Sequence, residues 1–113
     1  MELKKLFAGE GIPGPYNRIT HFPIVNKELG YDQMEVIFST TEKGNVGSLH
    51  NHPNSEHVMI VIEGSIRINT DKEGEHYDLL PGYALCMHPG EYHEVVNTYD
   101  GTTKYMVIYA PQR

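Results

Sequence analysis

Residues 44 to 64 read GNVGSLHNHPNSEHVMIVIEG, in which three histidines precede an unbroken apolar run. Alternate side chains of an extended strand share a face, so His50 and His52 are expected to point the same way, with their rings close enough to hold one ion. The pair Pro53-Asn54 then interrupts the strand, and a turn of the chain there would aim His57 into the same space. The run predicts two strands that present three imidazoles to a common point.

A fourth histidine, His93, follows the turn signal Pro89-Gly90 and opens another apolar stretch. Imidazole nitrogen binds Zn, Fe, Ni, Cu and Mn, whereas Ca and Mg prefer oxygen ligands. The histidines therefore predict one bound divalent transition metal of the kind Mn, Fe, Ni, Zn or Cu. Its predicted ligands are His50, His52, His57 and His93.

The other histidines and the single cysteine have simpler expected roles. A lone histidine on a strand is more often a hydrogen-bonded or solvent-facing residue than a metal ligand, which is the expectation for His21 and His76. His88, in a turn, is expected at the surface or supporting the ligands from outside. Cys86 is expected to be a small buried apolar residue.

The rest of the chain consists of short apolar stretches separated by glycine-containing turn signals about every ten residues, which is typical of an all-β sandwich or barrel. No stretch predicts a helix of more than a turn or two. Glycines and prolines crowd residues 1–16, which are expected to form an arm or loop ahead of a single barrel domain at 17–113. The predicted strands are 18–25, 33–40, 57–62, 65–70, 76–80, 83–87, 93–97 and 104–109.

Composition excludes several classes of partner. Fifteen acidic and nine basic residues among 113 give a formal net charge of -6, and a nucleic-acid backbone needs a basic face, so no nucleic acid is expected. No apolar run approaches the roughly 20 residues of a membrane-spanning helix, and residues 1–10 lack the apolar core of a secretion signal. No membrane partner is therefore expected, and the expected location is the cytoplasm. The tyrosines expected in the core or an interface are Tyr99, Tyr105 and Tyr109.

The two histidine segments resemble the motifs of the cupins, small β-barrels that bind one metal in the barrel mouth. The residues that match the first motif are Gly44, His50, His52 and Gly64, and those that match the second are Gly82, Gly90, His93 and Asn97. His57 stands where the family usually has glutamate, and His88 stands where it has proline. The resemblance implies a double-stranded β-helix, or jelly-roll, barrel. Small barrels of this kind commonly pair through an outer sheet face, so a homodimer is also expected.

Glu56 is the alternative ligand to its neighbour His57. Seven residues would then separate the ligand from Gly64, and Glu56 would face opposite to His57 on the strand. We therefore expect His57 to point inward, with Glu56 outward as an acid or base close by. A set of four neutral imidazoles leaves the ion with its full positive charge, which favours anionic or enolate-forming ligands.

The resemblance leaves more than one function open, because cupins include both enzymes and plain binding proteins. One interpretation is a dioxygenase, isomerase or lyase that acts on a small acid, keto compound or sugar by Lewis-acid or O2 chemistry. The run from Glu42 to Pro53 is also similar to cupins that act on unsaturated uronate sugars, whose motif has glutamine near position 56. The alternative is a non-catalytic barrel that binds a small molecule or sugar, or whose histidines serve structure alone.

Overall fold

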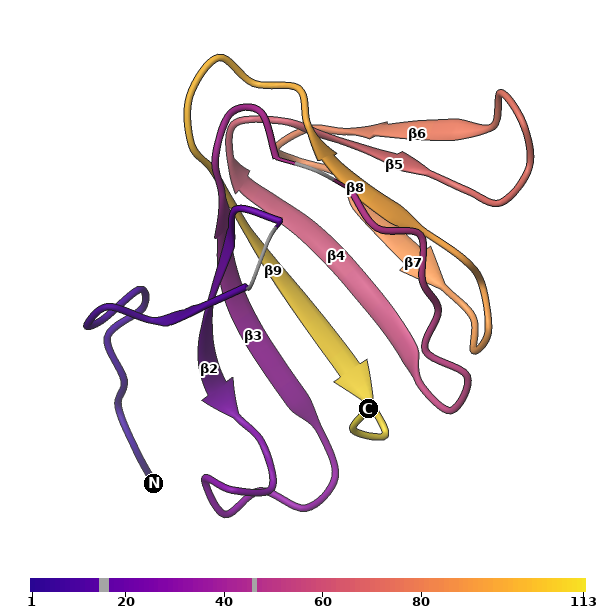
Figure 1. The fold of residues 1–113 in the computed structure, drawn as a ribbon. Helices are drawn as coiled ribbons and strands as arrows, with labels where there is room; N and C mark the ends of the chain where they lie inside the picture. Colours follow the sequence, from indigo (N-terminus) through magenta and orange to yellow (C-terminus); the bar gives the residue numbers. More distant parts are fainter. Residues whose placement is uncertain (15–16, 46) are drawn as a thin grey trace.

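The computed structural model describes residues 1–14, 17–45 and 47–113, and these form β-strands joined by turns (Figure 1). All eight predicted strands are present, with ends that differ by at most two residues from the expected ones. Over the described ranges, no helix is long and apolar enough to cross a membrane. The strands are β1 (Ile12–Pro13), β2 (Ile19–Val25), β3 (Glu35–Thr41), β4 (Glu56–Glu63), β5 (Ile66–Asn69), β6 (His76–Leu79), β7 (Ala84–Met87), β8 (Glu94–Asn97) and β9 (Thr103–Ala110).

Two antiparallel sheets make up the fold, which confirms the expected all-β jelly-roll class. The larger sheet has the strand order β1-β2-β3-β9-β4-β7, and the smaller has the order β6-β5-β8. The last strand, β9, lies between β3 and β4, so distant parts of the chain pair in the middle of the larger sheet (Figure 1). In these orders β1 and β7 are the edge strands of the larger sheet, and β6 and β8 are those of the smaller one.

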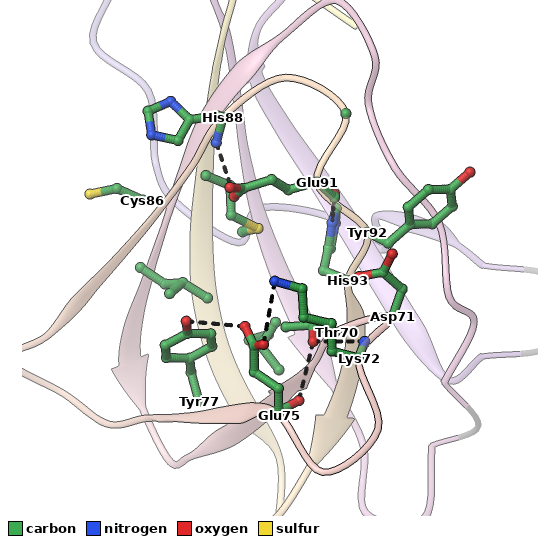
Figure 2. Close-up of a pocket in the computed structure, with 14 residues that line it drawn as sticks. Thr70, Asp71, Lys72, Glu75, Tyr77, Cys86, His88, Glu91, Tyr92 and His93 are labelled. Atoms are coloured by element: carbon green, nitrogen blue, oxygen red, sulfur yellow. Dashed lines mark hydrogen bonds and ion pairs between the residues drawn. The ribbon is translucent and has the colours of Figure 1, made fainter.

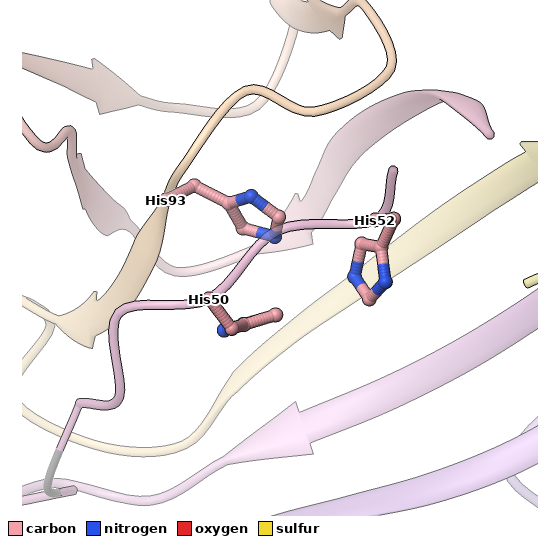
Figure 3. Close-up of side chains that lie close together, drawn as sticks. All are labelled: His50, His52 and His93. Carbon is pink, nitrogen blue, oxygen red and sulfur yellow. The ribbon is translucent and has the colours of Figure 1, made fainter. Parts of the chain in front are cut away.

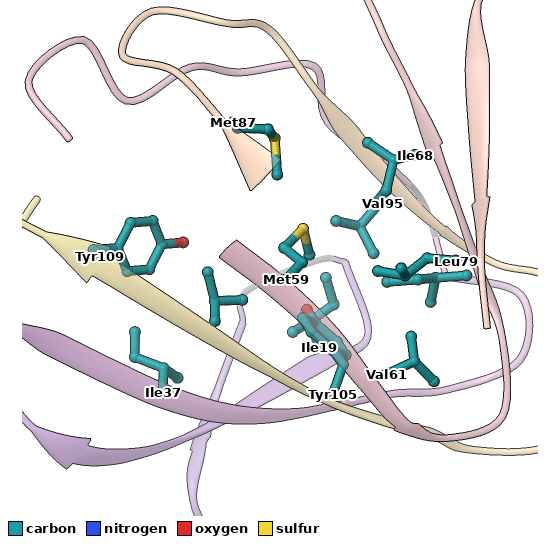
Figure 4. Close-up of a cluster of buried hydrophobic side chains, with 12 residues drawn as sticks. Ile19, Ile37, Met59, Val61, Ile68, Leu79, Met87, Val95, Tyr105 and Tyr109 are labelled. Carbon is teal, nitrogen blue, oxygen red and sulfur yellow. The ribbon is translucent and has the colours of Figure 1, made fainter. Parts of the chain in front are cut away.

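The core lies on the inner face of both sheets, and β4 shows why. His57, Met59 and Val61 of this strand are buried, whereas Val58 and Ile60 between them are only half-buried on the other face. Burying one such apolar side chain stabilises the fold by roughly 1.5–3 kcal/mol. The core residues, most of them labelled in Figure 4, are Ile19, Ile37, Met59, Val61, Ile66, Ile68, Leu79, Met87, Val95, Tyr105, Val107 and Tyr109.

The segment before β2 packs onto the larger sheet. Strand β1, which the sequence pattern did not predict, pairs with β2. The ring of Phe7 lies 5.5 Å from the rings of both Phe22 and Phe38. Pro15 and Tyr16, at the end of the expected arm, and Val46, in the histidine stretch, lie outside the described residues. The division of the chain after residue 16 stays a prediction.

Exposure corrects one sequence-based expectation and narrows another. Cys86 is exposed rather than buried, because it lies on the outward face of the edge strand β7, opposite Val58 of β4. Tyr99 is 45% exposed in the turn between β8 and β9, so it is not a core residue, and its place in an interface stays a prediction. Tyr105 and Tyr109 are buried, as expected.

Candidate metal centre

Backbone pairing brings His50 and His93 together. The N–H of His50 donates to the carbonyl oxygen of His93 at 3.0 Å, and the N–H of His93 donates back at 2.8 Å. Asn45 fixes the preceding segment on β8, because its Nδ2 donates to the carbonyl of Val95 at 2.8 Å and its Oδ1 accepts from the N–H of Asn97 at 2.6 Å. The two histidine ring centroids consequently lie only 4.3 Å apart.

The rings of His52 and His57 join this pair. The ring centroid of His52 lies 5.1 Å from that of His50 and 5.3 Å from that of His93. One ring nitrogen from each of these three residues lies within 4.8 Å of the others (Figure 3). An ion with bonds of about 2.1 Å can bridge nitrogens so placed after small side-chain movements. His57 does not belong to this group of three nitrogens, but its ring centroid lies 4.9 Å from that of His93 and 5.3 Å from that of His52.

Local hydrogen bonds fix which nitrogen two of the rings offer. Nδ1 of His50 lies 2.8 Å from the carbonyl oxygen of Ser48, and Nδ1 of His93 lies 3.2 Å from that of Glu91. A carbonyl can only accept, so each Nδ1 carries the proton and each Nε2 keeps a free lone pair. This is the arrangement in which a histidine binds a metal through Nε2 while a backbone oxygen orients its ring.

The hydrogen-bond partners of the buried ring nitrogens test whether a metal fits among these residues. Within the described ranges, Nδ1 and Nε2 of His57 and Nε2 of His52 are buried with no hydrogen-bond partner. Leaving one such group unpaired costs about 1–3 kcal/mol. A cation among the rings would accept a lone pair from both residues and remove most of this cost, so these residues fit a transition metal.

Burial keeps the cluster in the protonation state that metal binding requires. Desolvation, followed by the effect of the neighbouring imidazoles, lowers the pKa of His52 to about 3 and that of His93 to about 4. The same cause lowers the pKa of His57. These rings are therefore neutral near pH 7 and can donate lone pairs.

Glu56, the remaining predicted site residue, and the histidines expected outside the metal site do not join the ring cluster. Glu56 is exposed on the outward face of β4, while its neighbour His57 is only 3% exposed and faces inward. His21 has a ring nitrogen 3.0 Å from the hydroxyl of Ser39, which is the hydrogen-bonded role expected for a lone histidine. His88 is exposed, as expected for a surface position.

Two cavities adjoin the ring cluster. The smaller, of about 120 Å³, lies inside the barrel and is lined by His50 and His93 together with core residues of β3 and β9. The larger, of about 570 Å³, is lined by the β5–β6 hairpin and by residues 85 to 93, and it also reaches His93 (Figure 2). The exposed rings of Tyr77 and Tyr92 lie on its walls.

Sequence reasoning missed two residues of the smaller cavity. Tyr109 was expected in the core or an interface rather than at the site, but its ring centroid lies 5.0 Å from that of His52 and 5.2 Å from that of His57. Arg113 also lines the cavity, with its guanidinium carbon 4.6 Å from the Tyr109 ring centroid. No spacing or motif in the sequence links Arg113 to the histidines, because the contact arises only from the path of the chain after β9.

Several solved structures are similar to this chain. They include the polyketide cyclase RemF from Streptomyces resistomycificus (TM-score 0.82, 21% identity, covering 100% of this chain and 80% of that one). Ectoine synthase from P. lautus matches with a TM-score of 0.78 and 16% identity, covering 100% of this chain and 80% of that one. KdgF from Halomonas sp. matches with a TM-score of 0.73 and 19% identity, covering 88% and 86% of the two chains. At such identities the likeness shows the fold alone.

Sequence comparison identifies the family. None of the curated proteins matches the chain. The family model described as Cupin domain matches residues 37–109, which include all four histidines of the ring cluster. Because this match spans well over half of the residues, the chain belongs to the cupin family.

Proposed function

We propose that this protein is a metal-dependent cupin enzyme that acts on a small oxygenated substrate. Its metal would be one divalent transition ion held by His50, His52, His57 and His93. The observation that carries the proposal is the convergence of four imidazoles, two of which, His52 and His57, have buried nitrogens with no partner among the described residues. When bound, such an ion acts as a Lewis acid that polarises a carbonyl or hydroxyl oxygen.

The chain's own residues would position and shield the reacting group. Carbonyl oxygens of Ser48 and Glu91 hold two rings in a fixed orientation. The buried ring of Tyr109 covers His52 and His57 on the core side and excludes water there. Because all four ligands are neutral, they leave the ion its positive charge, which suits an oxygen-rich or anionic substrate.

Access to the ring cluster supports a catalytic role over a purely structural one. A structural metal site has all its positions filled by the protein, whereas a catalytic site keeps one open. Here His50 is exposed and two cavities reach the histidines. Similar folds among proteins named as a cyclase and a synthase support the same interpretation. The role of Glu56 as an acid or base stays a prediction. Because Glu56 lies on the outward face of β4, it would have to act from that face.

The second candidate is small-molecule binding without turnover. The larger cavity supports it, because two exposed tyrosine rings and several charged side chains could hold a sugar-like ligand there. A turnover assay on the metal-loaded chain separates the two candidates. Candidate acids, keto compounds and keto sugars would be screened for product formation and for O2 uptake. Ligand binding with no product or O2 uptake for any bound compound favours the second candidate.

Elemental analysis tests the metal itself. Protein prepared without contact with a nickel column should carry one transition-metal ion per chain. His52→Ala should lose that ion, because it removes one of the three clustered nitrogens. The matched control is His88→Ala, which removes an exposed histidine outside the cluster and should leave the metal content unchanged. A wild-type chain that holds no metal after incubation with Mn, Fe, Ni, Zn or Cu would refute the proposal.

A further inference from the structure

The smaller cavity contains a positively charged group that the ring cluster does not explain. Arg113 lines this cavity together with His50 and His93. Its guanidinium carbon lies 4.6 Å from the ring centroid of Tyr109, and that ring in turn contacts the ring of His52. The guanidinium is therefore separated from the imidazole cluster by a single aromatic side chain.

Glu35 holds this guanidinium in place. Nε of Arg113 donates to Oε1 of Glu35 at 3.0 Å, and Nη2 donates to Oε2 at 3.2 Å. The Glu35 side chain is 13% exposed and that of Arg113 is 36% exposed, so the pair lies at a partly covered rim. A bidentate pair of this kind fixes the plane of the guanidinium. The arginine is thus ordered before any ligand binds.

Part of the guanidinium remains available to a ligand. The contacts with Glu35 use Nε and Nη2, and among the described residues no hydrogen bond is made by Nη1 of Arg113. Neither Asp nor Glu is among the described residues that line the cavity, and the negative charge beside Arg113 is the Glu35 carboxylate that already pairs with it. Free N–H donors of a guanidinium favour an anionic group, and a carboxylate matches the planar donors of arginine.

We propose that Arg113 binds the carboxylate of a small 2-oxo or 2-hydroxy acid whose second oxygen faces the histidine cluster. The part of this inference that concerns the second oxygen rests on the proposed function. The cavity volume of about 120 Å³ sets the size of the ligand. A cavity of about 150 Å³ accommodates benzene, so this smaller cavity sets an upper bound of about six non-hydrogen atoms for the ligand. Arg113 is then a specificity-determining residue of the site.

Pyruvate and pyruvamide provide a matched pair of probes, because they have the same number of non-hydrogen atoms and only pyruvate is charged. Calorimetric titration of the Zn-loaded chain should show tighter binding of pyruvate. Arg113→Met keeps much of the side-chain length but removes the charge, and it should weaken pyruvate binding by about 10- to 100-fold. Pyruvamide binding should change by less than about twofold, since a neutral amide gains little from the charge.

Glu35→Gln is the control for a merely structural role of the ion pair. It breaks the pair but keeps the guanidinium, so it should retain the preference for pyruvate over pyruvamide. Equal affinities of the two probes for the wild-type chain would overturn the inference. Equal weakening of both probes by Arg113→Met, or loss of the preference in Glu35→Gln, would overturn it as well.

Metal content separates failure of this inference from failure of the proposed function. If the chain binds zinc but shows no preference for pyruvate, the role of Arg113 is wrong and the metal centre stands. If the chain does not retain zinc, the metal centre is wrong. In that case the same titrations are carried out on the metal-free chain. A preference for pyruvate that depends on Arg113 would support the role of Arg113, and the absence of such a preference would overturn that role.

Discussion

Burial of two imidazoles makes the stability of the metal-free chain depend on pH. The pKa of His93 is lowered from 6.5 to about 4, and that of His52 to about 3. Below pH 6.5 the unfolded chain takes up protons that the folded chain does not, so stability present at neutral pH is lost as the pH falls. His93 alone should lower the free energy of unfolding by at most about 1.4 kcal/mol per pH unit between pH 6.5 and 4.

Urea denaturation of the chelator-treated chain at pH 7.5, 6 and 5 measures this effect. The loss should be smaller when metal is bound, because the ion competes with protons for the ring nitrogens. A free energy of unfolding that is constant over this range in the metal-free chain would contradict the neutral, buried state of the rings.

His57 combines a cost to stability with a function. Leucine in its place fills a similar space and removes two buried nitrogens that lack partners among the described residues. We expect His57→Leu to leave the free energy of unfolding of the metal-free chain unchanged or to raise it by up to about 1 kcal/mol. The same variant should no longer retain metal.

Glu56→Gln is the matched control for this variant, because it changes the adjacent residue on the outward face of β4. It should leave both metal content and stability unchanged. Chemical denaturation and elemental analysis of the two variants measure both properties. Metal loss in Glu56→Gln with retention in His57→Leu would assign the ligand to Glu56 instead.

At the scale of the elements, the turn between β4 and β5 depends on a glycine. Gly64 has a φ of +96°, and a Cβ there would meet the Cα of Thr103 at 3.0 Å and its Oγ1 even closer. That hydroxyl accepts a hydrogen bond from the N–H of Ser65 at 3.1 Å, so it cannot easily move away. Gly64→Ala should therefore lower the free energy of unfolding by about 2 kcal/mol or more.

Gly74 provides the matched comparison in the turn between β5 and β6. It also has a positive φ, of +78°, but a Cβ there would meet no atom within 4 Å. Gly74→Ala should cost about 1 kcal/mol, from the backbone conformation alone. Urea denaturation of both variants measures the difference, and equal losses would show that contact with Thr103 contributes nothing.

At the scale of the whole molecule, the homodimer stays a prediction, and the outer face of the larger sheet is where we expect the two subunits to meet. Val58 and Ile60 of β4 lie on this face beside Met106 and Ile108 of β9, and all four are only half-buried. Phe7 covers a different part of the same sheet, over Phe22 and Phe38. Such an apolar face is commonly buried between subunits.

Light scattering at micromolar concentration should give the mass of a dimer. A lysine in the middle of this face, Met106→Lys, should shift the mass to that of a monomer, because it would bury an unpaired charge. Leu29→Lys alters an exposed leucine in the turn between β2 and β3 and should leave the dimer intact. A monomeric wild-type chain would refute the expectation of a dimer.

Most of the elements and the candidate ligands could be predicted from the sequence, because they depend on local patterns. Strand alternation places His57 inward and Glu56 outward. The rings of His50 and His52 also lie together as expected, but the strand expected through them does not form, and His50 makes only an isolated bridge to His93. Glycine and proline mark the turns that end the strands. Each of these properties is fixed by residues a few positions apart.

Contacts between distant segments were decided only by the tertiary structure. Cys86 is exposed because β7 lies at a sheet edge, and β1 forms because β2 is beside it. Arg113 lines the cavity because the path of the chain after β9 brings it there, beside Glu35, which lies 78 positions earlier in the chain. The alternation of apolar and polar side chains tells which face of a strand is buried. It cannot tell which strands become neighbours, because that depends on how the two sheets close around a shared core.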